Sequence, residues 1–388
     1  MIQISENTKL IQPSKIRKMF NKSLEYDQVL SFTLGEPDFT ASENVVEAGC
    51  RAIRGGQTKY SANAGLLALR QAISGYLKRT EGLEYDPASQ IVVTPGAMGA
   101  LYLALKAILN PGDEVIVSEP CWTNYIQQIQ MCGGVAVSVQ TSPERGFDLD
   151  VAAIRAAVTD RTRAIILNSP CNPTGAVASR EALDALAQVA EEFDLAVLAD
   201  EVYKHILFDG AAYTSLASLP GMAERTLVID SLSKTYAMTG WRVGFAAGPA
   251  GVIGQMTKLQ ENTSACASTP CQWAAIEALN GPQTHLEHMR EQYRIRRDYV
   301  MDRVTSIPGL SCSRPQGTFY AFLDIRRSGL DSESFAMRLL EEEQVVLVPG
   351  TAFGEFGEGY VRLSYAASMD SLEQGFDRIA AFMERCHG

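Results

Sequence analysis

Seven short apolar segments that alternate with helical patterns constrain the fold of this chain more than any other feature. They cover residues 91–94, 114–118, 135–139, 164–168, 196–199, 227–229 and 243–247 of the 388-residue sequence. Short segments that are apolar throughout are typical of strands in a parallel sheet whose two faces are both covered by helices. The alternation therefore predicts an α/β fold built on a mainly parallel, seven-stranded sheet.

One of the expected helices lies between the strands at 164–168 and 196–199, and Ser179 is placed to cap it. Its apolar residues recur at three- and four-residue steps, which predicts one buried face made of Leu183, Leu186, Val189, Ala190 and Phe193.

The pattern changes after residue 281 and predicts a second, smaller α+β domain. A long charged helical pattern covers residues 282–304, and alternating segments follow at 317–325, 345–350 and 360–366. We expect a last helix to be capped by Asp370, with Glu373 as its capping-box partner. The buried face of this helix is predicted to hold Leu372, Phe376, Ile379 and Phe382. We predict an N-terminal arm and part of the small domain at 1–40, a large domain at 41–281 and the rest of the small domain at 282–388.

The charge and the cysteines restrict the possible partners and the location. Lys and Arg total 34 against 45 Asp and Glu, so the formal net charge is −11, which repels nucleic-acid phosphates and anionic membranes. The eight cysteines show no C-x-x-C spacing and are expected to be reduced thiols. No stretch reaches the ~18 apolar residues of a membrane span, and residues 1–20 lack the apolar region of a signal peptide. We therefore expect a cytoplasmic protein with neither nucleic-acid nor membrane partners.

Several common catalytic motifs are absent from the sequence. There is no G-x-x-x-x-G-K, H-E-x-x-H or G-x-S-x-G, which argues against a nucleotide hydrolase, a zinc protease and an esterase. His285 and His288 have H-x-x-H spacing, but two ligands on one helical turn do not complete a tetrahedral shell. No metal site is predicted.

Lys234 is the first candidate catalytic residue. It follows the strand at 227–229, is preceded by Ser231 and Ser233, and has Arg242 eight residues later. A lysine held partly out of water can present a neutral amine that forms an imine. The alternative interpretation is a surface lysine at a turn.

Asp200 is the second candidate, at the end of an apolar strand, with Tyr203 three residues later. A carboxylate at a buried strand end is costly unless a cation pairs with it, and a protonated pyridine nitrogen would serve. The alternative is that Asp200 caps the next helix and Tyr203 packs on it.

Two further strand ends carry polar groups. After 164–168, a loop with two prolines can present Asn172 as a fixed hydrogen-bond donor. After 91–94, a glycine turn leaves the amides of Gly96, Ala97 and Met98 at a helix start where phosphate can bind. Each segment alone is also compatible with an ordinary turn. Together with Lys234 and Asp200, they meet the needs of pyridoxal phosphate.

An ordered set of motifs across nearly the whole chain supports the same interpretation. The segments are "LGEPDF", "TKYSANAGLLALR", "NSPCNPTGAV", "ADEVY", "SLSKTYAMTGWRVG", "VVLVPGTAFG" and "YVRLSYA". With them the sequence resembles the class I pyridoxal-phosphate-dependent aminotransferases of fold type I. Within this class it is most similar to the bacterial and archaeal branch of aspartate and aromatic aminotransferases.

The resemblance implies a role for each matching residue. It implies that Lys234 is the Schiff-base lysine and moves the Cα proton, that Asp200 pairs with the pyridine nitrogen, and that Tyr203 is the third catalytic residue. The remaining implied cofactor contacts are hydrogen bonds from Tyr203 and Asn172 to the ring oxygen O3′, stacking by Trp122, and a phosphate cradle of Ala97, Met98, Ser231, Ser233 and Arg242. The implied substrate-binding residues are Arg362 for the α-carboxylate, with Gly35, Asn172 and Trp122.

The resemblance also implies an assembly and a reaction. Tyr60 matches a tyrosine that reaches the phosphate of the neighbouring subunit, which implies a homodimer with shared active sites. The implied reaction is ping-pong transfer of the amino group of an aromatic amino acid or aspartate to a 2-oxo acid such as 2-oxoglutarate.

Two alternatives to this reaction stay open at this point. One is a pyridoxal-phosphate-dependent lyase or synthase of the same fold, and the other is a non-catalytic regulatory protein built on that fold. Candidate residues for side-chain specificity are residues 11–14 and the neighbourhood of Asn63.

Overall fold

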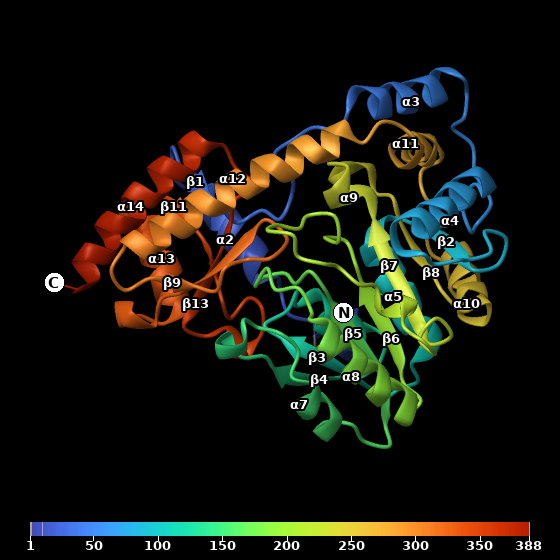
Figure 1. Ribbon diagram of the computed structural model, residues 1–388, viewed down its shortest axis with the longest axis horizontal. Helices are drawn as coiled ribbons and strands as arrows, with labels where there is room; N and C mark the ends of the chain where they lie inside the picture. Colours follow the sequence, from blue (N-terminus) through green and yellow to red (C-terminus); the bar gives the residue numbers. More distant parts are fainter. Residues whose placement is uncertain (1, 10, 388) are drawn as a thin grey trace.

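A seven-stranded sheet is the centre of the larger part of the protein, as the computed structural model of residues 2–9 and 11–387 shows (Figure 1). Its strand order is β2-β8-β7-β6-β5-β3-β4, and β8 is its one antiparallel strand. The strands are β2 (Ile91–Thr94), β3 (Glu114–Glu119), β4 (Val135–Gln140), β5 (Thr162–Asn168), β6 (Ala196–Asp200), β7 (Thr226–Ser231) and β8 (Gly244–Ala247). All seven predicted strands are confirmed, with ends shifted by two residues or fewer.

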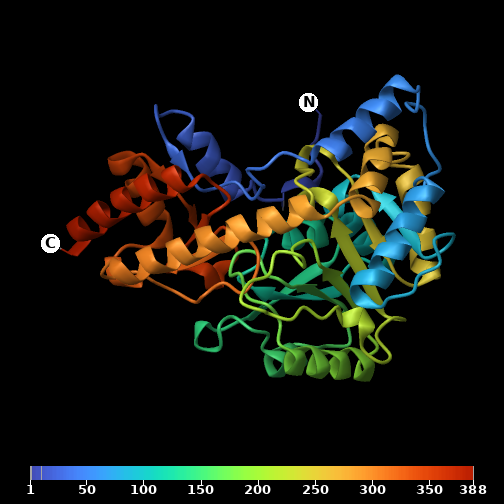
Figure 2. The ribbon, with the colours of Figure 1, turned by 45° about the horizontal axis from the view of Figure 1, so that its top comes forward.

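Helices cover both faces of this sheet because successive apolar side chains of each strand point to opposite faces. Val92 packs with α5, α6 and α10, whereas Val93 packs with α4 and α11 on the other face. Helices α7 and α8 cover that second face beside β5 and β6, and α8 lies below the sheet in green in Figure 2. The helices of this part are α3 (Glu43–Arg54), α4 (Leu67–Glu81), α5 (Gly96–Ile108), α6 (Asn124–Met131), α7 (Val151–Ala156), α8 (Arg180–Glu192), α9 (Leu232–Thr235), α10 (Ala250–Glu261) and α11 (Thr269–Asn280).

The predicted cap of helix α8 is confirmed, and the prediction of its buried face is wrong for one residue, Phe193. The hydroxyl of Ser179 accepts a hydrogen bond of 3.2 Å from the amide of Ala182. Phe193 lies just after the helix and is 39% exposed, because the helix ends at Glu192 before this side chain can turn to the sheet. Its ring instead packs under the guanidinium of Arg155, 5.5 Å from the ring centroid.

The smaller part is built on a four-stranded antiparallel sheet in the order β12-β13-β10-β9. The strand β1, from the first tenth of the sequence, pairs in parallel with β11 beside it, so this part is built from two segments that are far apart in the sequence. Its elements are α2 (Lys15–Ser23), β1 (Leu30–Ser31), α12 (Thr284–Ser306), β9 (Ser311–Cys312), β10 (Tyr320–Asp324), α13 (Ser332–Glu343), β11 (Val345–Val346), β12 (Val348–Pro349), β13 (Tyr360–Ser364) and α14 (Met369–His387). The short helix α1 (Glu6–Lys9) instead lies against α6 of the larger part. The long helix α12 extends from the larger part along this one in both ribbon views (Figures 1 and 2). Domain boundaries at residues 40 and 281 stay a prediction.

The last helix begins two residues earlier than a cap at Asp370 would place it, so that predicted cap is wrong. The hydroxyl of Ser368 accepts a 3.1 Å hydrogen bond from the amide of Ser371, so Ser368 is the residue that caps α14. Asp370 lies in the first turn, where its charge favours the positive end of the helix. The predicted face is confirmed, since Leu372, Phe376, Ile379 and Phe382 are all buried.

The eight cysteines form no disulfide. Among residues 2–9 and 11–387, no helix combines the length and the hydrophobicity that crossing a bilayer requires.

A buried ion cluster joins the turn after β6 to the end of β7. The ammonium of Lys204, with a side chain only 1% exposed, lies 2.6 Å from Glu81, 3.0 Å from Asp230 and 3.3 Å from Glu201. Burial raises the pKa of Glu201 and of Asp230, and the nearby carboxylate of Glu81 acts in the same direction, whereas the charge of Lys204 opposes both. The other carboxylate oxygen of Asp230 accepts the amide of Ser231 at 2.6 Å, which ties the cluster to the strand end.

We expect Lys204→Met to lower the free energy of unfolding by about 3–5 kcal/mol, because it leaves three buried carboxylates without their cation. Urea denaturation of the cofactor-free protein measures this change. The matched control is Glu201→Gln, which removes one negative charge and keeps the shape, and it is expected to cost less than about 1 kcal/mol. A Lys204→Met protein as stable as the Glu201→Gln protein would contradict a stabilising role for the cluster.

Candidate active site

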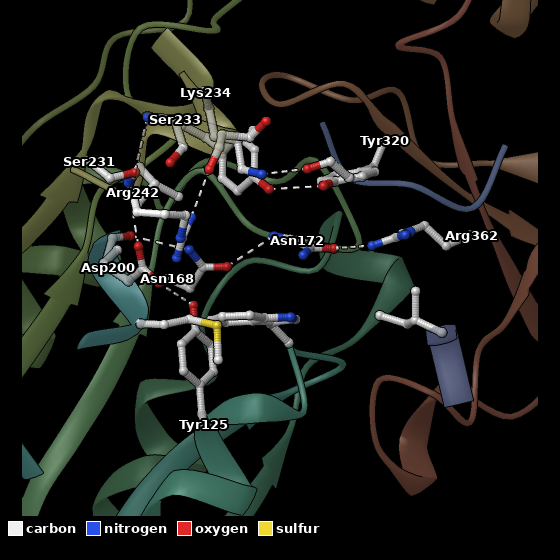
Figure 3. A pocket seen from close by; sticks show the side chains of 18 residues that line it. Tyr125, Asn168, Asn172, Asp200, Ser231, Ser233, Lys234, Arg242, Tyr320 and Arg362 are labelled. Atoms are coloured by element: carbon white, nitrogen blue, oxygen red, sulfur yellow. Dashed lines mark hydrogen bonds between the residues drawn. The ribbon is translucent and has the colours of Figure 1, made fainter. Parts of the chain in front are cut away.

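A cavity of about 240 Å³ lies where the carboxyl ends of β5, β6 and β7 face the smaller part (Figure 3). Except for Tyr60, every residue that the resemblance implies for catalysis, cofactor binding or substrate binding lines it: Gly35, Ala97, Met98, Trp122, Asn172, Asp200, Tyr203, Ser231, Ser233, Lys234, Arg242 and Arg362. The strand register brings these distant segments together, because Asn168 of β5 pairs with Asp200 of β6, and Asp200 pairs with Ile229 of β7.

Lys234 extends from the short helix α9 into the cavity, as Figure 3 shows. Its amine donates a hydrogen bond to the backbone carbonyl of Gly35, a residue that follows β1. Burial lowers the pKa of Lys234 to about 8, and the charges of Arg362 and Arg242 act in the same direction. A substantial fraction of this amine is therefore neutral near physiological pH, as nucleophilic and proton-transfer roles require.

Asp200 is a buried carboxylate that no cationic side chain of the described residues pairs with. Its Oδ2 accepts a 2.6 Å hydrogen bond from the hydroxyl of Tyr125, and its Oδ1 accepts the amide of Val202 at 3.4 Å. Burial raises the pKa of Asp200 to about 6, although the hydrogen bond from Tyr125 opposes this shift. Such a carboxylate is suited to a cationic ligand group.

Arg362 presents the opposite charge on the side of the smaller part (Figure 3). It is 2% exposed, and its amino groups donate to Asn172 Oδ1 at 3.0 Å and to the carbonyl of Thr33 at 2.5 Å. Its Nε has no acceptor within the described part of the chain. Because a guanidinium has five N–H donors, this buried cation keeps free donors for an anionic ligand group.

The start of α5 supplies the amides of the expected phosphate cradle. Pro95 provides no side-chain cap, and the first amides of a helix lack intrahelical acceptors. Gly96 has a φ of +77°, and a Cβ there would lie 2.5 Å from a terminal nitrogen of Arg242, so glycine lets the guanidinium approach these amides. Ser231 and Ser233 line the same end of the cavity. These groups suit a phosphate dianion.

Three sequence-based candidates lie outside the cavity. Tyr60 is 89% exposed and does not line it, and neither do residues 11–14 or Asn63. From the first 40 residues, Ile16 of α2 reaches the cavity together with Gly35.

Six lining residues were missed by the sequence-based assignment of site residues: Ile16, Tyr125, Asn168, Val202, Thr239 and Tyr320. Spacing could have indicated Tyr125, which follows Trp122 by three residues and packs edge-on to it with ring centroids 5.4 Å apart. Tyr320 lies in the alternating segment at 317–325, but alternation does not say which face holds the site. Among residues 2–9 and 11–387, no group of three or more His, Cys, Asp or Glu side chains is arranged to hold a metal ion.

Comparison with known proteins decides the family. A family model described as aminotransferase class I and II matches residues 27–379. The chain belongs to this family. The aspartate aminotransferase of Pyrococcus abyssi is 41% identical over 378 residues, which cover 97% of each chain. The aromatic-amino-acid aminotransferase 2 of Thermococcus litoralis is 40% identical, also over 97% of each chain.

The aminotransferase also shares its fold with solved relatives. A structure of the aspartate aminotransferase of Thermus thermophilus with maleate superposes with a TM-score of 0.94 at 40% identity, over 98% of this chain and 100% of that chain. The protein is therefore an enzyme of the transaminase class that uses pyridoxal phosphate, with the fold type I architecture. The relatives do not favour a lyase, a synthase or a non-catalytic regulator.

The donor set of the aminotransferase fits this cofactor. The buried carboxylate of Asp200 suits a ring nitrogen that can carry positive charge, and the helix start at Gly96 with Arg242 suits a phosphate. When bound, pyridoxal phosphate supplies an aromatic ring that withdraws electrons from the substrate Cα.

We expect the amine of Lys234 in the cofactor-free aminotransferase to react with acetic anhydride at a rate that rises through about pH 8. The reason is that burial disfavours the ammonium, and the neutral amine is the reactive form. Pulse labelling across a pH series, followed by mass spectrometry of the peptide, measures the midpoint, and exposed lysines in the same digest serve as internal controls. Arg242→Gln should move the midpoint upward, because it removes a nearby positive charge. A midpoint at or above pH 10 would show that Lys234 is not held out of water.

We expect Asp200→Asn to stabilise the cofactor-free aminotransferase by about 1–3 kcal/mol at pH 8, because burial raises the pKa of this carboxyl from 3.8 to about 6. A raised carboxyl pKa means that the ionised group destabilises the folded state above pH 6. The gain should therefore shrink as the pH falls from 6 to 4, and it should be lost only below about pH 3, where the carboxyl is neutral in both states.

Urea denaturation at pH 8, 6 and 4 follows this difference. The exposed Asp160 provides the matched control, and Asp160→Asn is expected to change the free energy of unfolding by less than about 0.5 kcal/mol. An Asp200→Asn protein that is less stable than the wild type at pH 8 would contradict the idea that Asp200 is kept for its ligand.

Proposed function

We propose that the lining residues hold pyridoxal phosphate in the roles that the resemblance implies. Asp200 pairs with the ring nitrogen, Tyr203 and Asn172 donate to the ring oxygen, and Trp122 stacks on the ring. Lys234 holds the cofactor and moves a proton at the substrate Cα. The remaining contacts are phosphate contacts from the amides of Ala97 and Met98, the hydroxyls of Ser231 and Ser233, and Arg242.

One observation carries this proposal. A single cavity holds an amine of lowered pKa, a buried carboxylate without a cationic partner and a buried guanidinium with free donors. General acid-base transfer is efficient when the pKa of the transferring group lies close to the operating pH, as the pKa of Lys234 does.

Arg362 binds the α-carboxylate of the amino acid in this proposal, with Gly35, Asn172 and Trp122 around it. Its two hydrogen bonds to Asn172 and to the carbonyl of Thr33 fix the plane of the guanidinium. A fixed plane orients the carboxylate by two parallel hydrogen bonds and so sets which Cα bond is broken.

We propose that the amino donor is an aromatic amino acid or aspartate and that the acceptor is a 2-oxo acid such as 2-oxoglutarate. The names of the Thermococcus litoralis and Pyrococcus abyssi relatives support these two donors. The lining favours the aromatic donor, because the apolar side chain of Ile16 lines the cavity and has no other role in this proposal. The cations that line the cavity are Lys234, Arg242 and Arg362, and each already has a role in this proposal.

We further propose a homodimer with shared active sites, in which Tyr60 reaches the cofactor phosphate of the neighbouring subunit. The support is that its side chain is 89% exposed and lies outside the cavity of its own subunit. The domain division at residues 40 and 281 and a cytoplasmic location complete the proposal, and the free cysteines support the latter.

A panel of twenty amino acids against 2-oxoglutarate, pyruvate and oxaloacetate tests the reaction. We expect oxo-acid formation only when an acceptor is present, with kcat/KM for phenylalanine or tyrosine at least about tenfold above that for aspartate, a difference of about 1.4 kcal/mol. Higher kcat/KM for aspartate would overturn the aromatic preference, and release of ammonia without an acceptor would overturn transamination.

Lys234→Ala is the control for the assigned chemistry in the same panel. It is expected to lower kcat by at least about a hundredfold, because general acid-base groups contribute 10²–10⁴-fold. Unchanged turnover in this variant would remove Lys234 from the mechanism.

A further inference from the structure

Tyr320 of β10 lies where three elements of the active site meet. It lines the cavity and is 1% exposed. Its hydroxyl is 2.9 Å from the hydroxyl of Tyr203, and its ring lies 4.4 Å from the guanidinium carbon of Arg362. Figure 3 shows Tyr320 and Arg362 together on the side of the cavity opposite Asp200 and Ser231.

The sheet of the smaller part sets the pairing of Tyr320 with Arg362. Strands β10 and β13 are antiparallel, and Phe322 is directly opposite Arg362. Tyr320 is two residues from Phe322 and therefore lies on the same face, diagonal to Arg362, within reach of a long side chain. The ring is thus held against the guanidinium by backbone pairing.

Gly35 shows how closely the hydroxyl of Tyr320 packs. A Cβ built on Gly35 would lie 2.2 Å from that hydroxyl, so a larger residue at position 35 would displace it. The carbonyl of Gly35 also accepts the hydrogen bond of the Lys234 amine. The hydroxyl of Tyr320 is therefore confined between Gly35 and Tyr203.

The number of hydroxyl protons decides which of Tyr203 and Tyr320 donates the hydrogen bond between them. Tyr203 has one hydroxyl proton, and in the proposed function it donates this proton to the ring oxygen of the cofactor. Its oxygen must then accept from Tyr320, which becomes the donor of the 2.9 Å hydrogen bond. A hydroxyl that accepts a hydrogen bond is polarised and becomes a stronger donor in turn.

We propose that Tyr320 is a positioning residue that couples the two ends of the active site. Its ring supports the guanidinium of Arg362 that binds the substrate carboxylate, and its hydroxyl directs the hydroxyl of Tyr203 toward the cofactor. This inference rests on the function proposed above.

The hydroxyl is tested with the variants Tyr320→Phe, Tyr203→Phe and the double variant, each loaded with pyridoxal phosphate. The readout is the pH midpoint of the absorbance change of the bound cofactor. A donated hydrogen bond stabilises a negatively charged ring oxygen, so weaker donation raises the midpoint. We expect Tyr320→Phe to raise the midpoint by about half a pH unit, which is a threefold change in the protonation equilibrium. Tyr203→Phe is expected to raise the midpoint more than Tyr320→Phe does.

If Tyr320 acts through Tyr203, the midpoint of the double variant can be predicted. Once Tyr203 has lost its hydroxyl, removing the hydroxyl of Tyr320 should change the midpoint no further. An unshifted midpoint in Tyr320→Phe, or an equal shift with and without the Tyr203 hydroxyl, would overturn the proposal.

The ring is tested by the KM for the amino acid. Tyr320→Phe keeps the ring and is expected to change KM by less than about threefold, whereas Tyr320→Leu removes it and is expected to raise KM on the order of tenfold. Equal KM values for these two variants would overturn the role of the ring. If the leucine variant does not fold, the midpoints of the phenylalanine variants decide alone.

Tyr293→Phe is the matched control. Tyr293 belongs to the same aromatic cluster, with its ring centroid 5.3 Å from that of Phe319, and it does not line the cavity. Its hydroxyl is buried without a hydrogen-bond partner among the described residues. We expect Tyr293→Phe to change neither the pH midpoint of the cofactor absorbance nor the KM for the amino acid. A midpoint shift as large as that of Tyr320→Phe would show that the shift in Tyr320→Phe comes from general repacking. Absence of cofactor absorbance in every protein, including the wild type, would instead refute the proposed function.

Discussion

Parallel pairing of β5, β6 and β7 is the constraint on which the rest of the structure depends. The register places Asn168, Asp200 and Ile229 side by side, so the loops that carry Asn172, Tyr203 and Lys234 leave the sheet at one edge. These strands are buried under helices on both faces, which fixes the position of that edge. The apolar core of the larger part is thus what gives the polar site its geometry.

The active site contains buried charged side chains that have no ionic partner in the part of the protein that the structure describes. Asp200 and Arg362 are buried on opposite sides of one cavity and lack ionic partners among the described residues, whereas Lys204 behind them is surrounded by carboxylates. Unpaired buried charge lowers stability, and natural proteins retain it where ligands supply the missing partner. The ion cluster around Lys204 therefore has a structural role, whereas Asp200 and Arg362 are available to pair with a cofactor and a substrate.

Local pattern was sufficient to predict the strands and the helix cap at Ser179, and it indicated Lys234, Asp200, Asn172 and the start of α5 as parts of the site. Gly35, Trp122 and Arg362 were expected only from the family resemblance, and six lining residues were missed. Local pattern failed where contacts join distant segments, as between Tyr125 and Asp200, 75 residues apart, and between Tyr203 and Tyr320, 117 residues apart. It also failed at helix ends, where Ser368 rather than Asp370 caps α14 and Phe193 stays exposed. Periodicity identifies a buried face, but the partner across that face depends on topology that a single sequence does not encode locally.

The pairing of β1 with β11 has a consequence for recombination between relatives. Thr33 and Gly35 directly follow β1, and their carbonyls accept hydrogen bonds from Arg362 and Lys234. A chimera that exchanges only the segment from α12 onward would set β11 and Arg362 of one relative against the β1 segment of another, so side chains that pack across this boundary would no longer match. The two segments that must be exchanged together are not contiguous in the gene. A graft that preserves the site must carry the β1 segment and the C-terminal segment together.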